Sequence, residues 1–147
     1  MFLGFDTSNY TTSVAVFDGK RIVQKKKLLE VKQGERGLRQ SDAVFQHTVN
    51  MPYLIDELVS EAECSGIDAV AVSTRPRNVD GSYMPCFLVG ENTARSVAAF
   101  SNASIFKTSH QVGHILAALF SVDRLELIKE PFIAFHVSGG TTEALLV

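Results

Sequence analysis

Two histidines four residues apart, His110 and His114, form the residue pair in this chain that is best suited to chemistry. On a helix, side chains at that spacing project from one face about one turn apart, so both imidazoles can bind one metal ion. Gly113 lies between them, and a glycine inside a helix costs ~1 kcal/mol relative to alanine, which favours a packing or ligand reason for it. The alternative is two histidines beside a helix start, one of them capping or solvated. No Asp, Glu or Cys nearby in the sequence is an obvious third ligand.

A glycine-rich turn near the end of the chain is the second candidate. Paired glycines let backbone amides approach a phosphate, and the neighbouring hydroxyls add donors. An ordinary two-residue hairpin turn, which Gly-Gly also favours, is the alternative. The residues concerned are Ser138, Gly139, Gly140 and Thr141. Asp6 and Ser8 belong to a similar turn near the N-terminus, where a carboxylate can orient water or a metal, or accept hydrogen bonds from turn amides.

These two turns lie in an internal repeat. Residues 2–17 and 132–147 each read as an apolar strand, a polar turn and a second apolar strand. The identical pairs are Phe2/Phe132, Phe5/Phe135, Ser8/Ser138, Thr11/Thr141 and Thr12/Thr142. A repeat of this kind indicates two related lobes that each open with a hairpin. We therefore predict a complete first lobe over residues 1–130 and the opening hairpin of a second lobe over 131–147.

The elements between the hairpins alternate in type. Apolar spacing predicts strands at 2–6, 12–17, 20–29, 68–73 and 104–107, and helices from Ser41, over 86–100 and from about His110. Strands joined by helices should lie parallel with right-handed crossovers. The sequence thus predicts an α/β fold with a mixed sheet flanked by helices. The element order resembles the ribonuclease-H-like lobe of the actin, hexokinase and Hsp70 ATPases.

Three residues lead to predictions about their local structure. Pro52 must kink or restart the first helix, because proline lacks the amide that the helical ladder needs. His47 is expected on the solvent-facing side of that helix. Gly90 is expected to permit close packing between a helix and a strand.

Composition narrows the class of protein. Hydrophobic residues make up 46% and charged residues 20%, a soluble globular balance, and no apolar run approaches the ~18 residues of a membrane span. The first apolar stretch meets Asp6 at once, which argues against a secretory signal. Two cysteines are too few for a disulfide framework, which favours a reducing cytoplasm.

The net charge of −2 argues against general DNA binding, but basic residues cluster in one stretch. That stretch is either a solvated strand and loop or a patch that meets RNA phosphates or an acidic partner. Its members are Lys20, Arg21, Lys25, Lys26, Lys27, Lys32, Arg36 and Arg39.

Taken in order, four segments resemble one family, known both as O-sialoglycoprotein endopeptidases (glycoproteases) and as tRNA threonylcarbamoyladenosine transferases. Residues 5–8 (Phe-Asp-Thr-Ser) look like the family's opening Glu-Thr-Ser, and residues 68–76 with 88–90 resemble its Gly-Pro-Gly segment and following helix. Residues 110–114 match His-x-Glu-Gly-His, and 137–140 match Val-Ser-Gly-Gly. The resemblance covers the whole chain but only the N-terminal half of a usual member. Peptidase activity has no support in the residues, since no nucleophile–base arrangement is visible.

The resemblance implies a site and a reaction. His110 and His114 would bind a divalent metal, zinc or iron, with an Asp from the missing C-terminal part as third ligand. The Ser138–Thr141 turn, with Asp6 and Ser8, would hold ATP or an adenylate. The full-length enzyme would transfer a threonylcarbamoyl or similar carbamoyl group to an adenosine of tRNA in the cytoplasm. The isolated chain would be inactive. As a further partner, we expect a second copy of the chain in a homodimer, or another family member in a heterodimer.

Several positions depart from the family pattern. Tyr10 and Thr11 replace an acidic pair, Thr141 replaces a histidine and Gln111 replaces a glutamate. Gly-Pro-Gly has become Arg75-Pro-Arg77, which makes both arginines candidate phosphate contacts. The expected metal-binding and phosphate-binding residues are present, whereas the residues expected around them for catalysis differ. We therefore interpret the chain as part of a divergent paralogue. Two alternatives remain: a non-catalytic dimerising paralogue, and a small-molecule kinase with Asp6 near a magnesium ion.

Overall fold

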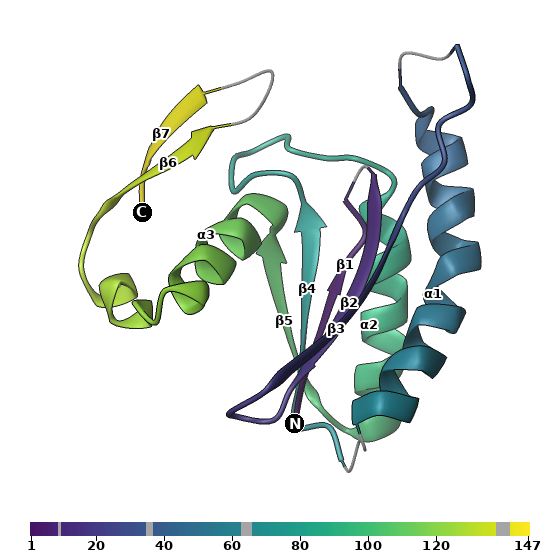
Figure 1. The fold of residues 1–147 in the computed structure, drawn as a ribbon, viewed down its shortest axis with the longest axis horizontal. Helices are drawn as coiled ribbons and strands as arrows, with labels where there is room; N and C mark the ends of the chain where they lie inside the picture. The colour runs from purple at the N-terminus through teal and green to yellow at the C-terminus, as the bar shows by residue number, and fades with distance from the viewer. Residues whose placement is uncertain (9, 35–36, 63–65, 138–141) are drawn as a thin grey trace. The chain divides into compact units, whose positions relative to one another are not determined.

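The computed structural model covers the chain in two compact units, Met1–His110 and Gln111–Val147. The structure describes residues 1–8, 10–34, 37–62, 66–137 and 142–147. Figure 1 shows the two units. The boundary between lobes at residues 130 and 131 stays a prediction. In the described part of the chain, every helix is too short or too polar to cross a membrane.

The first unit is built on a mixed sheet of five strands in the order β3-β2-β1-β4-β5. Strands β1, β2 and β3 are antiparallel neighbours, whereas β4 runs parallel to both β1 and β5 (Figure 1). The predicted mixed sheet is confirmed. The bounds are β1 Phe2–Asp6, β2 Thr11–Phe17, β3 Ile22–Leu28, β4 Ala69–Arg75 and β5 Ser104–Ser109.

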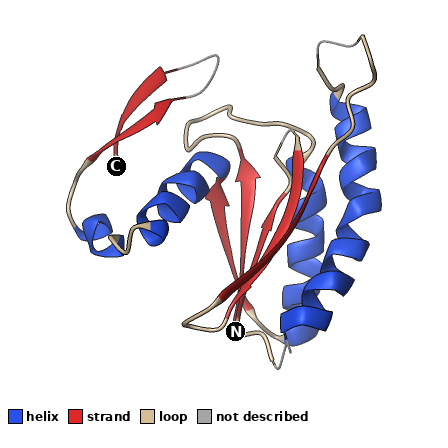
Figure 2. Ribbon diagram, viewed as in Figure 1, coloured by secondary structure: helices blue, strands red, loops and turns tan. Residues whose placement is uncertain are grey.

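Two long helices cover one face of this sheet (Figure 2). Helix α1 (Gln40–Ala62) lies against β2 and β3, and α2 (Phe87–Ser101) lies against β4 and β1. The helices face the sheet because their apolar residues recur at helical spacing, while β2 alternates buried and partly exposed positions. The resulting core contains Phe5, Val14, Val16, Val23, Met51, Leu54, Leu58, Val70, Val72, Ala94 and Ala98.

Helix α1 continues through Pro52 and does not restart there. Pro52 is exposed, while Met51 and Leu54 on either side of it are buried against the sheet. Burial of these flanking residues outweighs the hydrogen bond that the proline removes.

The expectation that His47 faces solvent is wrong. Its side chain is fully buried between α1 and the sheet, and its Nδ1 shares a 2.8 Å hydrogen bond with Thr12 Oγ1 on β2. Asn50 Nδ2 donates to the same hydroxyl over 3.4 Å. His47 Nε2 is buried with no hydrogen-bond partner among the described residues. Polar residues of α1 are therefore part of the core. Thr12 on β2 gives them a hydrogen-bond partner, which the periodicity of the helix cannot reveal.

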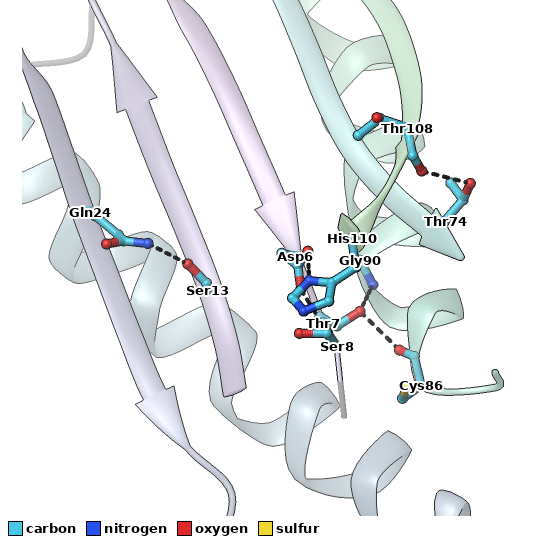
Figure 3. A network of polar contacts seen from close by, with 10 residues as sticks. All are labelled: Asp6, Thr7, Ser8, Ser13, Gln24, Thr74, Cys86, Gly90, Thr108 and His110. Atoms are coloured by element: carbon cyan, nitrogen blue, oxygen red, sulfur yellow. Dashed lines mark hydrogen bonds and ion pairs between the residues drawn. The ribbon is translucent and has the colours of Figure 1, made fainter. Parts of the chain in front are cut away.

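Thr7 fixes the start of α2 to the end of β1. Its Oγ1 donates to the Cys86 carbonyl over 2.9 Å and accepts from the Gly90 amide over 3.1 Å (Figure 3). A Cβ built on Gly90 would lie 2.9 Å from that Oγ1. The predicted close helix–strand approach at Gly90 is confirmed, and the hydroxyl of Thr7 is what occupies the space.

The second unit contains most of α3 (His110–Ser121), a short 3-10 helix (Leu125–Lys129) and a hairpin of β6 (Ile133–Val137) and β7 (Thr142–Leu146). The hairpin pairs Ile133 with Leu146 and His136 with Glu143. In the first hairpin, β1 and β2 pair Leu3 with Val16 and Asp6 with Ser13. The two registers are the same after a shift of 130 residues, so the repeat seen in the sequence is a repeat of hairpin geometry.

Replacing Gly90 with alanine should destabilise the protein by about 1–3 kcal/mol, because the new methyl group meets the Thr7 hydroxyl in a packed site. Glycine to alanine in an unconstrained helix has the opposite sign, a gain of up to ~1 kcal/mol. Urea unfolding measures the change, with Ser96→Ala on the exposed face of α2 as the control. Equal or greater stability of Gly90→Ala would contradict the contact.

His47 should make stability depend on pH. Burial lowers the pKa of His47 from 6.5 to about 4, against a smaller raising effect of the Asp6 charge. Between these values the unfolded chain binds more protons, so the free energy of unfolding should fall by about 3 kcal/mol from pH 6.5 to pH 4. Urea unfolding across this range should show a shallower slope for His47→Gln than for the unchanged protein. Identical slopes would mean that His47 is not buried in its neutral form.

Candidate functional site

The carboxyl ends of β1, β4 and β5 meet at one edge of the sheet, because these three strands are parallel. Ligands bind at this edge in open α/β sheets. The chain places polar residues there in all three strands, and α2 begins beside them through its contact with Thr7. The residues are Asp6 at the end of β1 with Thr7 and Ser8 after it, Ser73 to Arg75 at the end of β4, and Ser109 at the end of β5 with His110 after it.

Asp6 is the centre of this edge. One carboxylate oxygen accepts the backbone amide of Ser8 over 2.8 Å, and the other lies 2.9 Å from His110 Nδ1 (Figure 3). Burial is the largest single effect and raises the pKa of Asp6. The lowering effects, from the hydrogen bond and charge of His110 and from hydrogen bonds of Ser73 and Ser8, together outweigh it and lower the pKa from 3.8 to about 2.

The state of Asp6 determines the tautomer of His110. A carboxylate with this pKa is ionised at neutral pH and can only accept hydrogen bonds, so His110 Nδ1 carries the proton and donates it. When the ring is neutral, its lone pair is therefore on Nε2. The Phe87 ring of α2 lies 6.4 Å from the His110 ring, centroid to centroid, and further defines the position of the imidazole.

His114 follows one turn later in α3 and belongs to the second unit. Its ring stacks on that of His136 in β6, with centroids 6.2 Å apart and planes 22° apart. In the same unit, Gln111 Nε2 donates to Glu143 Oε2 over 3.3 Å, and Glu143 pairs with His136 across the hairpin. Residue-type spacing alone did not single out His136. The repeat could have found it, since His136 aligns with Asp6.

The remaining predicted site residues divide into two groups. Asp6 and Ser8 lie at the sheet edge and bond to each other. Ser138, Gly139, Gly140 and Thr141 lie outside the described residues, so the phosphate-binding turn stays a prediction. Within the part of the chain that is described, no group of three or more His, Cys, Asp or Glu side chains is arranged to hold a metal ion.

Arg75 occupies the last position of β4, opposite Ser109 and just past a register shift. Its Nη2 donates to Asn78 Oδ1 over 2.6 Å. Its Nε is buried and has no hydrogen-bond partner among the described residues. An unsatisfied buried donor costs about 1–3 kcal/mol, so this guanidinium is held in place at the expense of stability.

The basic stretch lies on and around β3, the edge strand of the sheet. Arg21 and Lys25 form ion pairs with Glu61 of α1, at 3.8 Å and 2.6 Å. Lysines along an edge strand also discourage pairing with other chains. These contacts favour the interpretation of this part of the stretch as a solvated strand.

Two solved structures share this fold across nearly the whole chain. YeaZ from Pseudomonas aeruginosa superposes with a TM-score of 0.57 at 15% identity, covering 99% of this chain and 66% of that one. A protein described as similar to peptidase YEAZ, also from Pseudomonas aeruginosa, gives a TM-score of 0.58 at 14% identity, covering 99% and 65%. These likenesses confirm the fold class that the element order predicted, an α/β lobe of the actin-like type.

The family follows from sequence. A model of the family described as TsaD, tRNA N6-adenosine threonylcarbamoyltransferase, matches residues 21–147. The chain belongs to this family. Proteins of that name from Ligilactobacillus salivarius and Thermosipho melanesiensis are 33% and 30% identical to it, each over 97% of the chain. The chain spans 40% and 43% of those two proteins, respectively, so the predicted resemblance to the N-terminal half of a member is confirmed.

Replacing Asp6 with asparagine should lower the free energy of unfolding at pH 7 by about 2 kcal/mol, because a charge-assisted hydrogen bond becomes a neutral one. The pKa of Asp6 is lowered, so its contribution is complete above pH 3.8 and is lost as the pH falls towards 2. Chemical unfolding at pH 7 and pH 3 should therefore show a smaller difference at pH 3. Glu57→Gln, an exposed carboxylate on α1, is the matched control and should show little change at either pH.

Proposed function

We propose that this chain is the N-terminal lobe of a metal- and nucleotide-binding enzyme that transfers a threonylcarbamoyl or similar carbamoyl group to an adenosine of tRNA. The observation that carries the proposal is the ionised Asp6 carboxylate bonded to His110 Nδ1 at the start of α3, the helix that also carries His114. Family membership supports the reaction class, and the sheet edge supports the location.

The donor set fits a divalent metal. Histidines that bind a metal through one ring nitrogen usually donate the other ring N–H to a carboxylate or carbonyl, which fixes the ring and its tautomer. Asp6 stands in this relation to His110. Two imidazoles one helical turn apart suit zinc or iron. Because the described residues provide no cluster of three, a further ligand has to come from elsewhere, as the family resemblance implies for an Asp in the C-terminal half.

When bound, the metal would supply Lewis-acid polarisation of a carbonyl. The residues of this chain would position the groups of the site. Asp6 orients His110, Thr7 holds the start of α2 beside the same edge, and Ser8 donates its amide to Asp6. The Ser138–Thr141 turn is proposed to hold the phosphate of ATP or of an adenylate, since glycine amides and hydroxyls suit a phosphate.

Elemental analysis of purified protein tests the proposal. We expect one zinc or iron per chain in the protein carrying both halves, and none in the His110→Ala, His114→Ala double variant. Asp6→Asn should weaken metal affinity about 10- to 100-fold, because it loses the carboxylate that orients His110. The control is Glu57→Gln, which removes a carboxylate away from the site.

Metal bound equally by the unchanged protein and the double variant would refute the site. A metal-free protein that forms a stable heterodimer with another family member would instead support the non-catalytic paralogue. Transfer of a phosphate from ATP to a sugar or acid would support the kinase.

A further inference from the structure

We propose that Arg75 binds an anionic group, a phosphate or a carboxylate, of a ligand at the carboxyl end of β4. This inference goes beyond the proposed metal site, because it rests on a different strand and on different atoms. It concerns residues of the first compact unit alone.

The position of Arg75 places it among the edge residues. Arg75 pairs with Ser109 on β5, the residue before His110, and the register shift between Ser73 and Arg75 ends the regular ladder there. Thr74 Oγ1 donates to the Thr108 carbonyl over 3.4 Å, which ties the two strand ends together (Figure 3). The guanidinium thus belongs to a fixed part of the backbone at the ligand-binding edge of the sheet.

Within the described ranges of the chain, no carboxylate forms an ion pair with the Arg75 guanidinium. Arg75 is half-buried, and the one polar partner of its side chain in the described part of the chain is the neutral Asn78 amide oxygen. Its Nε–H is buried and unpaired there. Buried charges in proteins are normally paired, because removal from water disfavours an isolated ion. A donor and a positive charge left without a partner together indicate an anion that binds from outside the chain.

The nearby carboxylates do not supply that charge. Asp6 is engaged with His110 and the Ser8 amide. Asp80, five residues beyond Arg75, is exposed and forms no ion pair with it. Glu91 on α2 is already paired with Lys107 and Arg95. No ion pair therefore joins Arg75 to a carboxylate among the described residues.

The loop after β4 restrains the guanidinium through the hydrogen bond from Arg75 Nη2 to Asn78. The Arg77 amide donates to Ser82 Oγ over 3.0 Å, and the Ser82 amide donates to the Val79 carbonyl over 3.2 Å. Gly81 in this loop has a φ of +76°, which a glycine adopts without strain. Asn78 is thereby presented to Arg75. A planar guanidinium fixed on one side offers parallel N–H donors on another, the geometry that recognises phosphate and carboxylate in a bidentate manner.

Calorimetric titration with inorganic phosphate and with succinate, in low-salt buffer, tests the proposal on the full chain. We expect one of the two anions to bind, and Arg75→Lys to weaken that binding about 10- to 100-fold, because lysine keeps the charge but loses the paired donors. Arg95→Lys on the exposed face of α2 is the matched control and should bind as the unchanged protein does. The preferred anion identifies the group as phosphate or carboxylate.

A second variant separates loss of binding from loss of folding. Arg75→Gln removes an uncompensated cation, so without an added anion it should unfold at the same or a higher urea concentration than the unchanged protein. In the presence of the anion that binds, the unchanged protein should become the more resistant of the two. Binding that is absent in the unchanged protein, or equally strong in Arg75→Lys and Arg75→Gln, would overturn the proposal. Metal content in Arg75→Lys should stay as in the unchanged protein, so this outcome is distinct from failure of the metal site.

Discussion

The hydrogen bond between Asp6 and His110 joins residues 104 positions apart. It connects the end of β1 to the first residue of α3, directly after β5. It is possible only because β1, β4 and β5 run parallel and end at one edge. The bond fixes the charge of one group and the tautomer of the other. The proposed metal site depends on those two states, since a protonated Asp6 could neither orient the imidazole nor hold the Ser8 amide in the same way.

The packing around this bond explains why the edge is well defined. Thr7, next to Asp6, accepts the Gly90 amide and donates to the Cys86 carbonyl, so that β1 and α2 hold each other in register. The absence of a side chain at Gly90 makes the contact possible. On the other side of the sheet centre, His47 and Thr12 join α1 to β2 through a buried polar contact. Polar pairs in a largely apolar core specify one arrangement of helices on the sheet, because any other arrangement leaves these groups unpaired.

The sequence resemblance contains both agreement and departure. The histidine pair and the Ser-Gly-Gly turn agree with it, whereas Arg75-Pro-Arg77 stands where the resemblance leads us to expect Gly-Pro-Gly. A glycine has no group to offer a ligand, but an arginine at the same edge brings a charge and a set of donors. Under the proposal for Arg75, this replacement adds an anion-binding group at the carboxyl end of β4.

Periodicity and turn chemistry determined most of the secondary structure. Apolar runs and turn signals such as Asp18-Gly19 predicted all five strands of the sheet, and the 130-residue repeat predicted a second hairpin whose register proves to be the same. These features are local, so neighbouring residues are enough to specify them. The sequence also singled out Asp6 and the His110–His114 spacing, because residue type and spacing limit the chemistry available.

Tertiary structure alone decided which partners these residues have. His47 became a core residue because Thr12, 35 positions away, meets it from β2, and helix α1 continued through Pro52 because its neighbours are buried against the sheet. Arg75 is left with an unpaired Nε donor among the described residues, because the one polar partner of its side chain there, Asn78, bonds to Nη2. Such outcomes depend on contacts between segments far apart in the chain, and the energy of a buried polar group is set by those contacts rather than by the residues beside it in sequence.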